Sequence, residues 1–99
     1  MEKLRVLSLD GNPISNFEPL AFLREIEGLS LANIGISDLS WARRMFGLKI
    51  LDLRDNKITD ASPLYDLQGL DDLDLRGNPI MAGDVEKLRK LLSNTGILF

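Results

Sequence analysis

The sequence repeats an aliphatic pattern every 22 residues over most of its 99-residue length. Successive copies open at Leu4, Ile26, Leu48 and Leu70. Further aliphatic residues follow three, five and ten places later in each copy, as Leu51, Leu53 and Ile58 do in the third. A fixed period of this length indicates a solenoid, in which each copy forms one coil and the coils stack.

The spacing of apolar residues changes within each copy. Leu7 and Leu9 are separated by one residue, which predicts a short strand with one buried face. In residues 62–70 the apolar residues are three apart, and Ser62 before Pro63 indicates a helical turn that Ser62 caps. We therefore expect parallel strands that are joined through short outer helices, with the aliphatic residues sharing one core.

An asparagine follows the strand in three of the four copies. Asn12, Asn56 and Asn78 stand where the chain must turn inward, and their amides can satisfy backbone groups that lack strand partners. The second copy has Ile34 at this place and Asn33 one residue earlier. Either the second asparagine contact is missing or the loop bulges to bring Asn33 into line. We expect a local distortion over residues 32–36 and the same fold.

The pattern L-x-x-L-x-L-x-x-N-x-I over 22 residues resembles the leucine-rich repeat. The closer similarity is to the short class found in internalins and in phosphatase-regulating and dynein-associated repeat proteins. This resemblance implies an α/β fold: a right-handed solenoid with a parallel sheet on its concave side and short helical or 3-10 turns on its convex side. It says little about function, because one fold serves many tasks.

We expect one leucine-rich repeat domain over residues 1–99. Its repeats span residues 4–25, 26–47, 48–69 and 70–82, and a helical cap spans residues 83–99. In the cap, residues 83–92 place Val85, Leu88, Leu91 and Leu92 on one helix face, with Asp84 as the N-terminal cap. Residues 96–99 predict a last strand, in which Ile97 falls 22 places after Leu75.

The N-terminal end has no comparable cap, since Leu4 already belongs to a repeat. An open strand edge pairs readily with another chain, and terminal repeats normally need a polar cover. Two interpretations follow. The chain is a piece of a longer repeat array, or it forms a homodimer through its N-terminal edge.

The residues between the inward leucines are expected to point out of the concave sheet, where they are candidates for binding a protein partner. They are Val6, Ser8, Asp10, Ser30, Ile50, Asp52, Arg54, Asp72, Asp74 and Arg76. One interpretation is a solvated grid of charges in which Arg54 and Arg76 neutralise neighbouring aspartates. The other is a polar contact patch anchored by these arginines, because arginine is enriched at interfaces. Cation binding by Asp52, Asp72 and Asp74 is a third, weaker alternative.

Trp41 replaces the Pro19 and Pro63 of neighbouring copies on the convex side. It either packs over adjacent coils, where Ala42 is small, or forms a second contact site with Arg43 and Arg44. Large aromatic residues and arginine dominate binding hot spots.

The composition argues against several other functions. There is no histidine or cysteine, so the common catalytic nucleophile–base pairs cannot form, and we expect no enzymatic activity and no cofactor. A net charge of −3 disfavours nucleic acid, and no apolar run is long enough for a membrane span or a signal peptide. We expect a non-catalytic module that binds a protein, in a compartment that is unknown but more consistent with the cytoplasm. The alternative is a structural or assembly module.

Overall fold

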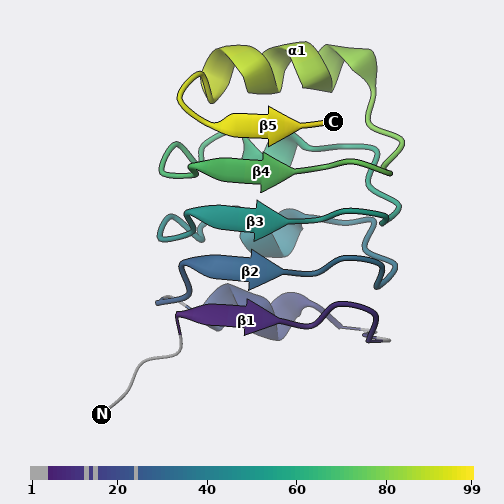
Figure 1. The fold of residues 1–99 in the computed structure, drawn as a ribbon, viewed down its shortest axis with the longest axis vertical. Coiled ribbons are helices and arrows are strands. Elements are labelled where there is room, and N and C mark those ends of the chain that lie inside the picture. The colour runs from purple at the N-terminus through teal and green to yellow at the C-terminus, as the bar shows by residue number, and fades with distance from the viewer. Residues whose placement is uncertain (1–4, 13, 15, 24) are drawn as a thin grey trace.

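In the described part of the chain, five short parallel strands form a single sheet in chain order (Figure 1). The computed structural model describes residues 5–12, 14, 16–23 and 25–99, so Leu4 lies outside the described residues. The strands are β1 (Val6–Ser8), β2 (Gly28–Ser30), β3 (Ile50–Asp52), β4 (Asp72–Asp74) and β5 (Gly96–Leu98). Leu7, Leu29, Leu51 and Leu73 are directly opposite one another. The predicted solenoid and its 22-residue register over four strands are confirmed.

Among the residues that the structure describes, three 3-10 turns lie behind the sheet: η1 (Glu18–Phe22), η2 (Ser40–Ala42) and η3 (Ser62–Leu64) (Figure 1). The first residue of each turn donates its backbone N–H to a side-chain oxygen two residues earlier in the chain. These pairs are Asn16 with Glu18, Asp38 with Ser40 and Asp60 with Ser62. The predicted capping role of Ser62 is therefore wrong, because Asp60 supplies the oxygen at 2.9 Å. The hydrogen bonds from the backbone and side chain of Ser62 also hold the pKa of Asp60 below its ordinary value.

The apolar core is complete in the second, third and fourth coils and thinner in the first. The repeated leucines of β2, β3 and β4 are at most 2% exposed. Leu7 and Leu9, at the equivalent places of the first coil, are only partly buried. Each coil therefore depends on the coils on either side to cover its aliphatic residues.

Asn56 ties the third coil to the second. Its Oδ1 accepts the backbone N–H groups of Ile34 and Ile36, both at 3.1 Å. Its Nδ2 donates to the carbonyl oxygens of Leu31, at 2.8 Å, and Leu53, at 3.0 Å. The asparagine side chain is buried, so an unpaired group in its place costs about 1–3 kcal/mol.

Asn78 repeats this arrangement one coil later. It accepts the N–H of Ile58 at 3.1 Å and donates to the carbonyl of Leu53 at 2.7 Å. Asn12, by contrast, donates to Leu9 within its own coil. The prediction that the asparagines bond backbone groups is confirmed. The structure adds that Asn56 and Asn78 each accept N–H groups of the preceding coil.

The second coil departs from the others at Gly35. Asn33 has a φ of 57°, in the same left-handed turn as Gly11, Asp55 and Gly77, so it is a turn residue and leaves Ile34 in the asparagine position. Ile34 instead packs into the core. Gly35, with a φ of 82°, adds a left-handed residue that the third and fourth coils lack. The local distortion predicted for residues 32–36 is confirmed, and the second asparagine contact is missing.

The helix α1 (Ala82–Leu91) closes the C-terminal end of the stack (Figure 1). Leu88 and Leu92 are buried and Val85 is partly buried, but Leu91 is 46% exposed, so its predicted core position is wrong. The predicted capping role of Asp84 is also wrong. No side chain caps the helix, which begins after Met81.

Asp84 attaches α1 to the third coil instead. Its carboxylate accepts the backbone N–H of Ala61 at 3.0 Å and the hydroxyl of Tyr65. Burial and this hydrogen bond raise the pKa of Tyr65 to about 12. Asp84 lies in the first turn of α1, and its side chain reaches the neighbouring coil rather than the free N–H groups of the helix start.

The predicted last strand is present as β5, but in a different register. Ile97 pairs with Leu73 rather than following Leu75 by one repeat. The connection through α1 makes this coil two residues longer than the others. An even shift keeps side chains on the same face of a strand, so Ile97 still points to the core.

Candidate functional site

We define the sheet face as the side formed by the first and third residues of each strand, which point away from the core. The strand pairing aligns Val6, Gly28, Ile50, Asp72 and Gly96 in one column, and Ser8, Ser30, Asp52, Asp74 and Leu98 in the next. The other predicted partner-binding residues, Asp10, Arg54 and Arg76, follow two places beyond their strands. The sequence-predicted residues therefore lie on one surface, to which the structure adds Leu98.

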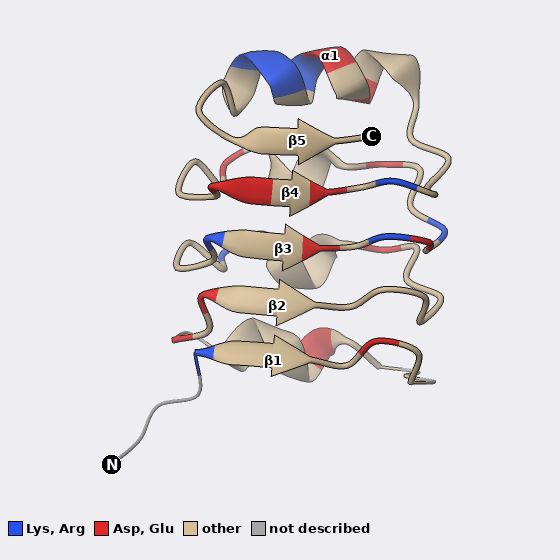
Figure 2. Cartoon of the chain, viewed as in Figure 1, with Lys and Arg blue, Asp and Glu red and all other residues tan. Residues whose placement is uncertain are grey.

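Charges gather on the C-terminal part of this face, on β3, β4 and the segments that follow them (Figure 2). Arg54 Nη2 lies 3.0 Å from Asp52 Oδ2, and Arg76 Nη2 lies 2.7 Å from Asp74 Oδ2. Arg54 Nε also lies 3.7 Å from Asp74 Oδ2, which joins the two pairs. The predicted internal neutralisation is therefore confirmed.

The pKa values of these groups move in the directions that such pairing requires. Hydrogen bonds to Asp52 raise the pKa of Arg54, and those to Asp74 raise that of Arg76. The hydrogen bond from Arg76 lowers the pKa of Asp74 despite partial burial. Both arginines stay charged, and their planar groups are held in place along the sheet.

Asp10 makes a second set of polar contacts at the N-terminal part of the face. Its carboxylate accepts the hydroxyl of Ser30 at 2.7 Å and the backbone N–H of Ala32 at 2.8 Å. The bond from Ser30 is the main cause of the lowered pKa of Asp10. Sequence reasoning placed Asp10 and Ser30 on the same surface but missed their pairing, which arises because Asp10 lies two residues beyond Ser8, the strand partner of Ser30.

Three large aliphatic side chains stand out on this otherwise polar face. Val6, Ile50 and Leu98 are 70%, 53% and 51% exposed. Val6 lies beside Gly28, where a Cβ would come into van der Waals contact with it. Ile50 and Leu98 border a shallow hollow of about 490 Å³, which also contains Asp72 and Gly96. The face thus combines apolar positions with fixed charges.

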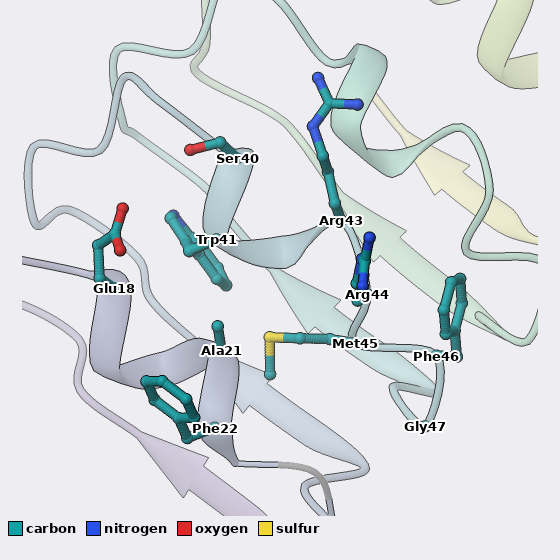
Figure 3. Close-up of a pocket in the computed structure, with 10 residues that line it drawn as sticks. All are labelled: Glu18, Ala21, Phe22, Ser40, Trp41, Arg43, Arg44, Met45, Phe46 and Gly47. Atoms are coloured by element: carbon teal, nitrogen blue, oxygen red, sulfur yellow. The ribbon is translucent and has the colours of Figure 1, made fainter.

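The convex side carries a second depression, between η1 and η2 (Figure 3). Trp41 is only 7% exposed, belongs to the core, and its Nε1–H donates to the carbonyl of Asp38 at 2.9 Å. Packing against adjacent coils is therefore its main role. Trp41, Arg43 and Arg44, the three predicted convex residues, all line the depression.

The described part of the chain offers little for metal chemistry or membrane insertion. No three acidic, histidine or cysteine side chains among residues 5–12, 14, 16–23 and 25–99 are grouped so as to hold a metal ion. The cation alternative for Asp52, Asp72 and Asp74 therefore has no geometric support. Over the same residues, no helix has the length and apolarity that a bilayer crossing requires.

Parallel strands that alternate with 3-10 turns, with an asparagine contact between coils, define the class of leucine-rich repeat solenoids. Residues 47–90 match the family model described as Leucine Rich repeats (2 copies), and residues 3–24 match that of the Leucine Rich Repeat. The chain belongs to the leucine-rich repeat family. Domains of this family are typically protein-interaction modules and are generally non-catalytic.

Solved structures place the chain near the internalins of Listeria monocytogenes. An internalin (inlF) superimposes with a TM-score of 0.88 at 32% identity, covering 97% of this chain and 28% of that one. Internalin C2 gives a TM-score of 0.86 at 41% identity, covering 97% and 41%. Rat (Rattus norvegicus) Tsukushi is 41% identical in an 86-residue alignment that covers 79% of this chain and 24% of Tsukushi. The chain therefore spans less than half the length of these relatives.

Proposed function

We propose that this domain recognises a protein partner through its sheet face, without catalysis. The observation that carries the proposal is the exposure of Val6, Ile50 and Leu98 on a surface whose other side chains are small or charged. Aliphatic side chains that a partner covers contribute about 25 cal/mol per Å² of buried apolar area. Membership of a family that typically binds proteins supports the same conclusion.

The ion pairs fix the side chains that lie next to these exposed aliphatic residues. Because Asp52 and Asp74 already hold Arg54 and Arg76, these side chains lose little further freedom when a partner arrives. Their charges are largely compensated within the pair. We therefore assign the arginines to orientation and specificity and the aliphatic residues to affinity.

Capture from an extract of the source organism tests this assignment. Immobilised parent domain is compared with Ile50→Lys and with the double variant Asp52→Lys/Arg54→Glu. Met81→Lys is the matched control, because Met81 is 68% exposed and lies outside the sheet face. We expect the captured proteins to be lost with both sheet-face variants and retained with the control. Capture of the same proteins by all four domains would contradict the proposal.

A second candidate function is assembly of two copies through β1. The supporting observation is the incomplete burial of Leu7 and Leu9 at the edge strand, where the equivalent leucines of later coils are covered. With α1 over the opposite end, such pairing would stop at a dimer. Light scattering over a range of concentrations tests this, with Val6→Glu as the disrupting variant. A parent chain that stays monomeric at all concentrations would rule it out.

A further inference from the structure

The depression on the convex side, which we call the convex groove, occupies about 680 Å³ between η1 and η2. Phe22 and Phe46 border it and are 79% and 61% exposed, which is unusual for phenylalanine on a small domain. Met45 lies between them in the view of Figure 3, and Arg44 lies next to Phe46. The groove thus presents two open aromatic rings above a buried floor.

The residues of the convex groove break the repeat that shapes the rest of the chain. Where the second copy has Arg43 and Arg44, the third copy has Tyr65 and Asp66. Phe46 corresponds to Gln68 in the third copy. The next pair of turns, η2 and η3, therefore carries no equivalent combination of aromatic rings and arginines. Packing alone does not require it, because the core-facing positions are filled in both copies.

The two pairs of arginines on this molecule differ in their partners. Arg54 and Arg76 each form ion pairs on the sheet face. Among the described residues, no carboxylate lies within ion-pairing distance of Arg43 or Arg44, although Asp60 is close enough to Arg43 to attract it electrostatically. Glu18 lines the same groove but stands at the far end from Arg44 in Figure 3. The groove is therefore positive at one end and negative at the other.

We propose that the convex groove binds a short acidic peptide segment that carries an aromatic or large aliphatic residue. That residue packs between Phe22 and Phe46, and the carboxylates next to it pair with Arg43 and Arg44. Glu18 orients the segment, because it repels the acidic end. A nucleic acid or an anionic membrane presents many charges over a wide area, and a chain of net charge −3 repels such surfaces outside the groove.

Trp41 supplies a direct readout, because it is the single tryptophan of the chain and lines the groove. The probe is an acetylated and amidated peptide, Gly-Asp-Phe-Leu-Glu-Glu-Asp, which contains no tryptophan. Two control peptides replace either its acidic residues by lysine or its Phe-Leu pair by serine. Titration of the domain to millimolar peptide should change the tryptophan emission saturably with the acidic peptide only.

Matched variants separate the groove from general charge effects. Arg43→Glu/Arg44→Glu should weaken binding by about tenfold or more, since it replaces two attractive contacts by repulsive ones. Phe22→Ser should also weaken it. Lys87→Glu/Lys90→Glu changes the net charge equally on exposed residues of α1 and should leave binding unchanged. Circular dichroism verifies that each variant is folded.

Several outcomes would overturn the proposal. They are a parent domain that shows no saturable change, equal binding of the lysine peptide, and unchanged binding by the arginine variant. A response to phosphatidylserine vesicles without a response to the acidic peptide would assign the groove to a membrane surface instead. None of these outcomes bears on the sheet face, whose variants leave the convex groove intact.

Discussion

The two ends of the solenoid are held in different ways. At the C-terminal end, α1 covers the stack with Leu88 and is attached to the third coil through Asp84 and Tyr65. At the N-terminal end, Leu7 is only partly buried and the second coil offers Ile34 where an asparagine would reach back to the first. Stability in a stacked repeat depends on contacts between neighbours, so the first coil should open before the others. The first coil is thus both less deeply buried and without the asparagine contact that the later coils receive.

The largest loss of stability is expected when the C-terminal end loses part of its cover and so becomes as incompletely buried as the N-terminal end. Leu88→Ala leaves a cavity beneath α1, because Leu88 is fully buried. We expect the free energy of unfolding to fall by about 3 kcal/mol. Urea denaturation followed by circular dichroism measures this. A loss below about 1 kcal/mol would mean that α1 contributes little to closing the stack.

Removing the asparagine contact between the second and third coils should weaken the second coil as well as the first. Asn56→Ala leaves the N–H groups of Ile34 and Ile36 without their acceptor, and we expect a loss of about 2 kcal/mol. Hydrogen exchange should show faster exchange at these two amides than at Ile58. Asn12→Ala is the matched control, because among the described residues the exposed Asn12 bonds only within its own coil, and it should cost less. Equal losses for both variants would argue against the directional role of the asparagines.

Acid should weaken both ends through their carboxylates. The folded pKa of Asp74 lies below its ordinary value of 3.8, so its contribution is fully present above that value and is lost as the pH falls through the folded pKa. Asp10, at the N-terminal junction, has the same sign. Urea midpoints between about pH 6 and pH 3 should therefore fall less steeply for Asp74→Asn than for the parent. Parallel curves would show that the Arg76 pair does not stabilise the fold.

The smallest expected effect strengthens the closed end. Gly83 lies near the start of α1, and an added Cβ there would meet no neighbouring atom. Gly83→Ala should raise the free energy of unfolding by about 0.5 kcal/mol, because alanine has the higher helix propensity. Thermal unfolding detects the change as a small rise in Tm. A lower Tm would indicate that glycine is required for the entry into the helix.

The parts of this fold that follow from periodicity could be predicted from sequence. Leu29, Leu51 and Leu73 occupy the same place in each coil, so their register required no knowledge of side-chain geometry. Departures from the repeat were less predictable. The position of Asp84 suggested a helix cap, but its reach to Tyr65 depends on how α1 lies over the third coil.

The candidate surfaces divide in the same way. Arg54 and Asp52 were placed together correctly, because residues two apart along an extended segment share a face. Leu98 was missed, since the two-residue shift of β5 cannot be read from the repeat. The exposure of Phe22 and Phe46 beside Arg44 depends on how two neighbouring turns pack, which sequence spacing does not determine.

The backward reach of the asparagines also bears on how the chain folds as it leaves the ribosome. Asn56 supplies the bonds that complete the coil synthesised before it, and Asn78 does so for the next. A nascent chain therefore carries an unfinished last coil at every stage of translation. Only when α1 and β5 emerge does the final coil gain its cover, so lasting structure in this domain forms after its last elements have left the ribosome.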